Sequence, residues 1–294
     1  MRSILVPTDG SALSARAVPV AEAIARAQGA EIVLVRVVEP WNTSGLGFES
    51  YVTSDVYDEM QEALEIAAQQ DLAMMVERIK ARGGPARSVV FSGVPGAGLL
   101  DSEEAVQPDL VVIASHGRSG LVRFALGSVT ERLVRAGNAP VLVVQASSAT
   151  DSPLGSALVP LDGSSLAELA LPMVEGLAGK PIRQVRLLRA VNRSDEIAPA
   201  QEYLEQVARR LGVMGIDVTV DVAIGEPVPA IAEAATGADL VVLATHGRGG
   251  FDRLRHGSVA EQVTRDAHTP VLLVRANREV AMTDTSFRVA AGAV

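Results

Sequence analysis

Apolar and polar positions follow a block pattern along this chain. Short runs of β-branched and aliphatic residues, such as residues 31–38 and 110–114, are bounded by polar or glycine-containing segments. Between these runs, stretches such as residues 56–82 and 199–211 carry apolar residues at helical spacing. The short runs predict buried strands and the longer stretches predict helices. Strands that alternate with helices in this way indicate a parallel sheet with helices on both faces and right-handed crossovers.

The block pattern occurs twice. Residues 109–131 and 239–261 share one layout: an apolar strand, a glycine-bearing loop and a Gly-Ser pair that opens a helix. These copies are 130 residues apart (239 − 109), whereas Asp9 and Asp162, which end the first strand of each half, are 153 residues apart (162 − 9). The extra residues lie mainly between the second and third strands of the first half, where Trp41 is found.

The repeat predicts two domains, which also suits the length of 294 residues, because single cores usually stop growing below that size. We predict an α/β protein with two tandem, doubly wound, Rossmann-like domains, each a five-stranded parallel sheet of strand order 3-2-1-4-5. Residues 1–146 form the first domain, residues 156–276 the second, and residues 277–294 a C-terminal tail. The tail lacks a clear period and is expected to be poorly ordered.

Composition and charge narrow the class of protein. The chain has 26 basic and 35 acidic residues, so its formal net charge is −9, which argues against a nucleic-acid-binding surface. No stretch approaches the roughly 20 apolar residues of a membrane span, and the apolar run at the N-terminus is too short for a signal peptide. The absence of cysteine excludes disulfides and thiol catalysis. We therefore expect a cytoplasmic protein without nucleic-acid or membrane partners.

The duplicated stretch suits a bound anion. In doubly wound sheets, ligands bind at the carboxyl ends of strands where the strand order reverses. Asp9 and the loop at Gly117 follow strands that are neighbours in a 3-2-1-4-5 order, so they would face one crevice. The pair Gly127-Ser128 then presents free N–H groups and a positive helix end, as a phosphate requires. The nine residues between Gly117 and Gly127 can wrap around a polyphosphate.

The same residues allow plainer interpretations, which the sequence leaves open. Ser128-Val-Thr-Glu131 and Ser258-Val-Ala-Glu261 each fit a capping box, which needs no ligand. Asp9 and Asp162 could cap the helices that follow them, and a lone carboxylate is weak evidence for Mg²⁺.

Arginine and histidine residues in the two loops are further candidates for ligand contacts. Arg118 and Arg248 are candidates for phosphate contacts because guanidinium pairs well with phosphate oxygens, although both could be solvated loop residues. His116 and His246 are expected to shape the loop or touch phosphate rather than to act as bases. The acidic run at residues 101–104 indicates a solvated helix face.

These motifs resemble the universal stress protein family. The pattern Gly-x-x-Gly, nine residues, then Gly-Ser, after a Pro-x-Asp-x-Ser strand end, covers both halves, with Ala114 and Ala244 in place of the first glycine. Similarity to the ATP-binding branch implies that Asp9 and Asp162 approach the adenosine. The remaining contacts implied are Pro7 and Pro160 beside those aspartates, Val37 and Ala190 at adenine, Ala114 and Ala244 at ribose, and Gly117, Gly127, Ser128, Val129, Gly247, Gly257, Ser258 and Val259 at the phosphates.

The resemblance implies a function as well. We expect a cytoplasmic stress protein that binds ATP, with or without Mg²⁺, in stress response or signalling, with at most slow hydrolysis. It also implies that the two halves pack as an intramolecular pseudo-dimer through their last strands, and that two chains associate as a homodimer. The alternatives are a nucleotide-free interaction module and an adenylating enzyme of related fold. Neither a Walker lysine motif nor the dinucleotide fingerprint follows the first strand.

Overall fold

The computed structural model describes residues 1–40, 54–115, 127–148, 154–245 and 259–276. The first half contains β1 (Ser3–Pro7), η1 (Ser14–Arg16), α1 (Ala17–Gln28), β2 (Glu31–Val38), α2 (Ser54–Ala81), β3 (Ala86–Ser92), α3 (Pro95–Val106), β4 (Leu110–Ala114), α4 (Ser128–Ala136) and β5 (Val141–Val144). The second half contains β6 (Ser156–Pro160), α5 (Ser165–Glu168), α6 (Leu171–Leu177), β7 (Gln184–Val191), η2 (Ser194–Glu196), α7 (Ile197–Gly212), β8 (Asp217–Ile224), α8 (Pro227–Ala235), β9 (Leu240–Thr245), α9 (Val259–Asp266) and β10 (Val271–Arg275).

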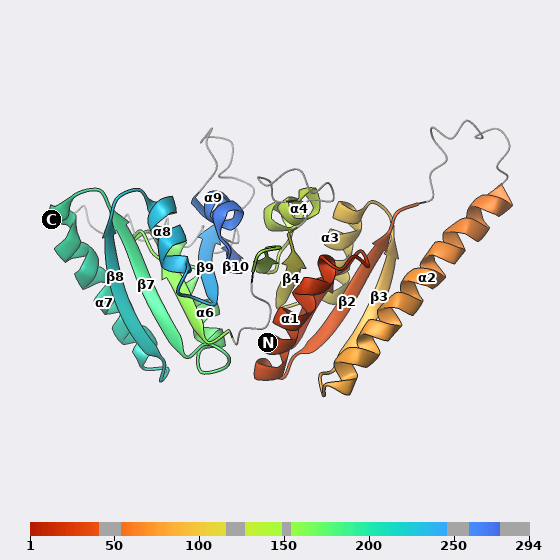
Figure 1. Ribbon diagram of the computed structural model, residues 1–294, viewed down its shortest axis with the longest axis horizontal. Coiled ribbons are helices and arrows are strands. Elements are labelled where there is room, and N and C mark those ends of the chain that lie inside the picture. The colour runs from red at the N-terminus through yellow and green to blue at the C-terminus, as the bar shows by residue number, and fades with distance from the viewer. Residues whose placement is uncertain (41–53, 116–126, 149–153, 246–258, 277–294) are drawn as a thin grey trace, which may run out of the picture.

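The ten strands of the described ranges join one sheet, whose order is β3-β2-β1-β4-β5-β10-β9-β6-β7-β8 (Figure 1). Within each half the strands are parallel and follow the order 3-2-1-4-5, which confirms the predicted fold. The halves meet at their last strands, where β5 and β10 pair antiparallel, with Val143 opposite Val271 and Val141 opposite Leu273. The expected intramolecular pairing is therefore present, and the two halves share a continuous sheet.

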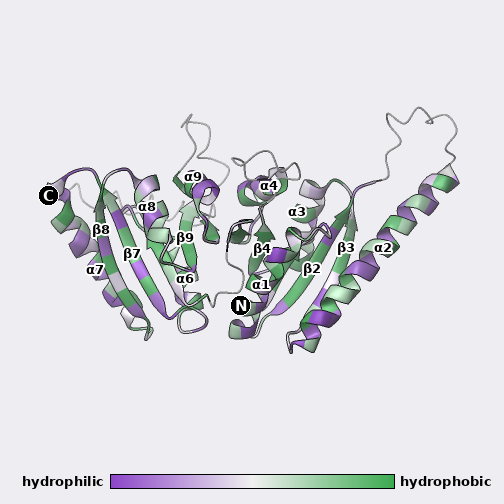
Figure 2. Cartoon of the chain, viewed as in Figure 1, coloured by the Kyte–Doolittle hydropathy of each residue, from purple (hydrophilic) through white to green (hydrophobic). Residues whose placement is uncertain are grey.

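Helices cover both faces of this sheet, as the continuous apolar strands require. One buried cluster lies under α1, α2, α6 and α7, and a second lies under α3, α4, α8 and α9. Each cluster draws residues from both halves, and Figure 2 shows the strands as predominantly apolar. Successive strand residues alternate between the clusters: Ile4 and Val6 belong to the first and Leu5 to the second.

Matching aspartates join the start of the first strand to the start of the fourth in each half. The Asp109 carboxylate accepts hydrogen bonds from the backbone N–H groups of Arg2 and Ser3, the latter at 3.1 Å. The Asp239 carboxylate accepts from the N–H groups of Gly155 and Ser156, both at 3.0 Å. Partial burial alone would raise the pKa of Asp109, but the two backbone donors and the positive charges of the N-terminus and Arg2 together hold this pKa below its ordinary value.

In the acidic run at residues 101–104, Asp101 and Glu104 are exposed as predicted, but the prediction of a solvated face is wrong for Glu103. This side chain is buried, and its Oε1 accepts hydrogen bonds at 2.5 Å from the N–H groups of Asn138 and Ala139. Glu103 thus links α3 to the turn before β5. Single-sequence periodicity gave no sign of this, because the partners lie 35 and 36 residues away.

Candidate functional site

A cavity of about 790 Å³ opens at the carboxyl ends of β1, β2 and β4, at the point where the strand order of the first half reverses. Its size lies within the range typical of small-ligand sites. The described residues that line it are Pro7, Thr8, Asp9, Ser14, Val35, Arg36, Val37, Val38, Glu39, Leu64, Val94, Pro95, Gly96, Leu99, Ile113, Gly127, Ser128, Val129, Thr130 and Arg132.

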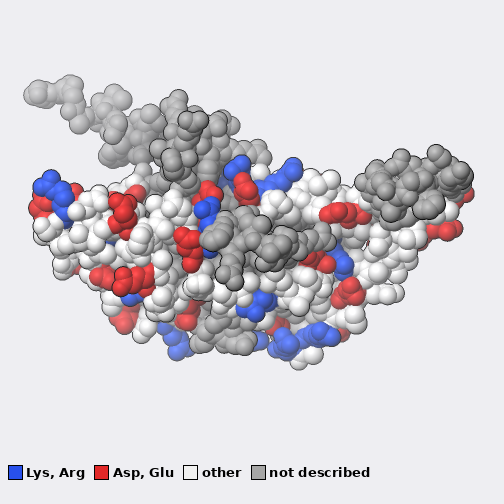
Figure 3. Space-filling model, turned by 45° about the horizontal axis from the view of Figure 1, so that its top comes forward, with Lys and Arg blue, Asp and Glu red and all other residues white. Residues whose placement is uncertain are grey.

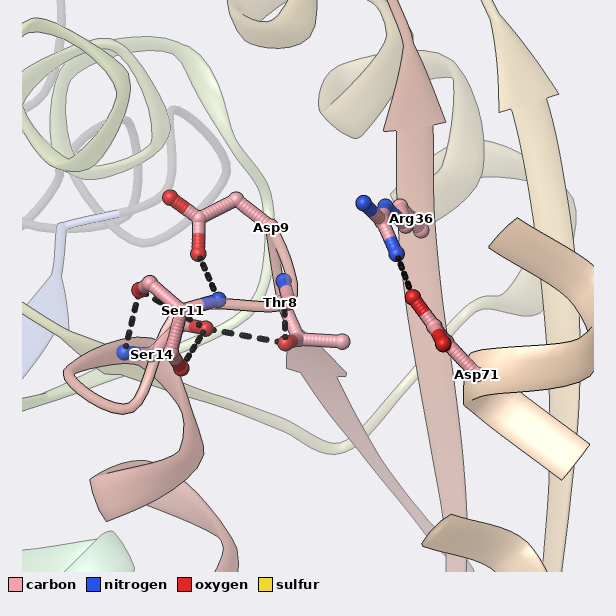
Figure 4. A network of polar contacts seen from close by, with 7 residues as sticks. Thr8, Asp9, Ser11, Ser14, Arg36 and Asp71 are labelled. Carbon is pink, nitrogen blue, oxygen red and sulfur yellow. Dashed lines mark hydrogen bonds and ion pairs between the residues drawn. The ribbon is translucent and has the colours of Figure 1, made fainter. Parts of the chain in front are cut away.

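A hydroxyl network shapes the β1 side of the cavity. Thr8 Oγ1 and Ser14 Oγ lie 2.9 Å apart, and both side chains are buried. Asp9 Oδ1 accepts a hydrogen bond of 2.9 Å from the N–H of Ser11 and does not cap η1, whose N-cap residue is Leu13 (Figure 4). The turn depends on Gly10, whose φ of +82° disfavours any residue with a side chain. It holds the Asp9 carboxylate at an exposed position beside the cavity.

An arginine from β2 lies close to this turn. A Cβ on Gly10 would lie only 3.1 Å from Nη1 of Arg36, so the guanidinium packs directly against the turn backbone. The same Nη1 forms an ion pair of 2.9 Å with Asp71 of α2 (Figure 4). Arg36 is thereby fixed at the rim, while its neighbour Val37 belongs to an apolar wall with Leu99 and Ile113.

The opposite end of the cavity is the first turn of α4. Gly127 is the N-cap residue, no side chain caps the helix, and Ser128 is its first residue. The capping-box interpretation of Ser128-Val-Thr-Glu131 is therefore wrong, since Ser128 is not in the capping position. The first N–H groups of a helix have no intrahelical partners and carry a partial positive charge, so this end of the cavity suits an anion.

The structure brings together most of the described residues that were predicted for the first site. Those that line the cavity are Pro7, Asp9, Val37, Gly127, Ser128 and Val129. Ala114 ends β4, is fully buried and belongs to the cluster under α1, so its methyl group lies in the core and not on the cavity wall. Gly117, Arg118 and His116 lie outside the described residues.

The second half places its counterparts on the matching elements. Pro160 ends β6, Asp162 follows it, Ala190 lies in β7, Ala244 lies in β9 and Val259 begins α9. Asp162 Oδ1 accepts a hydrogen bond of 2.9 Å from the N–H of Ser164, which repeats the Asp9 turn. The remaining predicted residues, His246, Gly247, Arg248, Gly257 and Ser258, lie outside the described residues.

Arg189, which corresponds to Arg36 in the second half, has a different partner. Cζ of Arg189 lies 5.3 Å from the ring centroid of Tyr203, which is a cation–π contact. The Tyr203 hydroxyl donates a hydrogen bond of 2.9 Å to Oε1 of Glu168. Burial, this hydrogen bond and the negative charge of Glu168 together raise the pKa of the Tyr203 phenol.

The sequence analysis did not predict six polar residues that line the first cavity: Thr8, Ser14, Arg36, Glu39, Thr130 and Arg132. The repeat carried a signal for one of them, because Arg36 and Arg189 stand at matching positions immediately before Val37 and Ala190. The other five have no identical counterpart in the second half, so a comparison of the two halves does not reveal them.

The described surface gives no second indication of a ligand class. Lys and Arg side chains are interspersed with Asp and Glu over the face shown in Figure 3, without a continuous basic stripe among the described residues. Within the same residues, no group of three or more His, Asp or Glu side chains could hold a metal ion. None of the helices in the described ranges is both long and apolar enough to cross a bilayer.

Comparisons with known proteins agree with the fold and the repeat. The model of the universal stress protein family matches residues 1–145 and 155–275. A universal stress protein of Mycolicibacterium smegmatis is 30% identical over 288 residues, covering 92% of this chain and 96% of that protein. Universal stress protein Rv2005c of Mycobacterium tuberculosis is 31% identical over 186 residues; that match covers 58% of this chain and 62% of the relative.

A solved structure is similar over almost the whole chain. The crystal structure of a universal stress protein from Archaeoglobus fulgidus has a TM-score of 0.77 and 22% sequence identity, covering 94% of this chain and 98% of that chain. This likeness supports the fold alone. Together with the two family matches, which span most of the sequence, it identifies the chain as a member of the universal stress protein family.

Proposed function

We propose that this universal stress protein binds ATP and acts in a nucleotide-dependent stress response or in signalling, with at most slow hydrolysis. The observation that carries the proposal is the cavity of the first half. It joins an apolar wall, an exposed carboxylate and an anion-favouring helix end within about 790 Å³. These three environments match the base, the ribose and the phosphates of a nucleotide.

Each environment has a residue to supply it. Val37, Leu99 and Ile113 offer an apolar surface on which a purine could pack. Asp9 would accept hydrogen bonds from ribose hydroxyls, because a carboxylate is an acceptor. Gly127 and Ser128 would place backbone N–H groups at the phosphates. The second half has the matching Asp162 turn, so we propose that it also binds nucleotide.

We propose that the cavity hydrolyses ATP slowly at most. The polar side chains that line the described cavity are hydroxyls, two carboxylates and two arginines, and no histidine is among them. Arginines and N–H groups can hold phosphates, but hydrolysis also needs a positioned water. We therefore propose that nucleotide binding itself is the signal.

We also propose a cellular location and an oligomeric state. We place the protein in the cytoplasm, on the basis of its family and composition. We also propose that two chains associate, because α2 leaves apolar side chains such as Val56, Met60 and Leu64 exposed. Sedimentation of a dilute sample should show a species of twice the chain mass, and a purely monomeric species would refute the association.

Nucleotide binding is tested by calorimetric titration of ATP into nucleotide-stripped protein. We expect saturable binding below millimolar concentration. The replacement Ser128→Asp should remove the first site, because a carboxylate at the helix end repels phosphate. Titrations without heat at millimolar ATP would refute the proposal and favour a nucleotide-free interaction module.

A further inference from the structure

An arginine that family resemblance does not mark crosses the anion end of the first cavity. Arg132 lies one turn after Ser128 on the same face of α4, and both residues line the cavity. Its side chain runs over Gly96 in the first turn of α3, where an added Cβ would lie 2.8 Å from Arg132 Cδ and 3.8 Å from Nη1. Gly96 is therefore what allows Arg132 to take this path.

Arg132 is an exposed cation beside two helix starts. Its guanidinium lies beside the first turns of α3 and α4, where helix dipoles present partial positive charge. Among the described residues, Arg132 forms no hydrogen bond or ion pair that would neutralise it. A negatively charged ligand group between the two helix ends would be attracted by the guanidinium and by both helix dipoles.

Both Gly96 and Arg132 are replaced by other residues in the second half. The register of β2 and β3 matches that of β7 and β8, so Phe91 corresponds to Ala223, 132 residues later (223 − 91). At that separation Gly96 corresponds to Val228, and α4 and α9 align Arg132 with Gln262 at a separation of 130 (262 − 132). Val228 packs against the core cluster where Gly96 left room. The second half therefore has valine in place of Gly96 and the shorter, neutral glutamine in place of Arg132.

The charge difference is local to this end of the site. Val94 lines the first cavity and is the N-cap residue of α3, whereas Glu226 is the N-cap residue of α8. At the β2 end the difference is opposite, because Glu39 corresponds to Asn192. Among the described residues of the two sites, the first half is thus more positive where α3 and α4 begin, and the second half is more negative at the matching place.

We propose that Arg132, admitted by Gly96, makes the first half selective for the more highly charged nucleotide, and that the second half lacks this selectivity. The inference rests on the proposed nucleotide function and adds a ligand preference for each half. A guanidinium that contacts a terminal phosphate discriminates ATP from AMP, because AMP lacks the outer phosphates. Gln262 and Glu226 offer no equivalent cation.

The test measures the ratio of AMP and ATP dissociation constants at one half. Full-length, nucleotide-stripped protein with Ser258→Asp serves as the parent, so that binding reports the first half. We expect Arg132→Gln to lower the preference for ATP over AMP about tenfold, the usual scale of one charge-assisted hydrogen bond that is partly exposed. Gly96→Val should do the same by displacing Arg132, and Arg132→Lys should lower the preference by about threefold.

A matched control and a reciprocal exchange complete the design. Arg135→Gln makes the same substitution one turn away, at an exposed arginine paired with Glu131, and should leave the preference unchanged. In protein with Ser128→Asp, the double replacement Val228→Gly with Gln262→Arg should raise the ATP preference of the second half. Equal preferences in the Arg132→Gln and Arg135→Gln proteins would overturn the inference while ATP binding stands. A parent that binds neither nucleotide would overturn the proposed function together with it.

Discussion

The two halves of this protein share a fold but differ, in matched pairs of side chains, around the carboxyl ends of their first two strands. In the first half, buried hydroxyls of Thr8 and Ser14 lie 2.9 Å apart. The matching positions of the second half hold Leu161 and Ala167, so a polar pair has become an apolar pair.

The apolar wall that contains Val37 also differs between the halves in side-chain volume. A Cβ on Gly98 would lie 2.7 Å from a methyl group of Val37, which the backbone does not allow without a shift. In the second half the glycine corresponds to Ala230 and the valine to the smaller Ala190. The strand residue is thus two carbon atoms smaller in the second half, and the helix residue is one carbon atom larger.

The arginines at the rim are kept while their partners change. Arg36 forms an ion pair with Asp71, and Arg189 stacks on Tyr203, which stands 132 residues after Asp71 (203 − 71). By contrast, the core positions of the same two helices keep their character: Leu72 and Leu204 are both almost fully buried. The fold thus rests on positions that both halves share, while the residues around these strand ends differ pair by pair. A common fold does not imply a common ligand preference.

The largest expected effect is at the seam that both halves share. Val143→Asp would place a carboxylate at a fully buried position opposite Val271 in β10. We expect a loss of at least about 4 kcal/mol in the free energy of unfolding, because a buried charge without a partner is strongly destabilising. Urea denaturation measures it, with Ser88→Asp on the exposed part of β3 as control. A loss below about 1 kcal/mol would show that the seam does not hold the halves together.

The packing of residue 37 against residue 98, and of residue 190 against residue 230, can be tested by exchanging side chains between the halves. Gly98→Ala should destabilise the protein by about 1–2 kcal/mol through overpacking against Val37, and Val37→Ala in the same chain should recover most of that loss. In the second half, Ala190→Val should be destabilising and Ala230→Gly should rescue it. Thermal or urea denaturation of single and double variants gives the coupling. Strictly additive effects would contradict the assignment of these residues as packed pairs.

The strand-joining aspartates predict a pH dependence. Because the pKa of Asp109 is lowered in the folded chain, its ionised form contributes stability above its ordinary value of 3.8, and this contribution is lost as the pH falls through the lowered pKa. Asp109→Asn should therefore cost about 1–2 kcal/mol near neutral pH and less at about pH 3. Denaturation at several pH values tests this. A constant difference between the variant and the unmodified protein would show that the carboxylate charge is not involved.

The smallest effects are expected at the partners of the two arginines. Tyr203→Phe keeps the ring under Arg189 but removes the hydrogen bond to Glu168, so we expect a loss of about 1 kcal/mol. Asp71→Asn weakens a largely exposed ion pair and should change stability by less than about 0.5 kcal/mol. If the Asp71 variant lost more than the Tyr203 variant, the ranking of the two contacts would be reversed.

The sequence was sufficient for the fold because its signals are local. Continuous apolar strands, helical spacing and a repeated motif predicted the strand order and the pairing of the last strands, which the structure confirms. The turn after the first strand at Asp9 and the helix start at Ser128 also have local sequence signals, and both were predicted.

Features that depend on partners far along the chain were not predicted. Glu103, with partners near residue 138, and Arg132, which crosses to a glycine 36 residues earlier (132 − 96), look like ordinary surface residues in the sequence. Ala114 shows the limit in another way. The motif gave no sign that strand geometry turns its methyl group into the core, and its contact with ribose stays a prediction. Side-chain direction depends on register, which the motif alone does not give.

The most direct test of the account is a calorimetric titration of ATP into nucleotide-stripped protein, with Ser128→Asp, Ser258→Asp and the double variant titrated in parallel. We predict saturable binding below millimolar ATP in the unmodified protein, loss of one site in each single variant and loss of both in the double variant. Absence of binding at millimolar ATP, or binding that the double variant retains unchanged, would contradict the assignment of the two Gly-Ser pairs to the nucleotide sites.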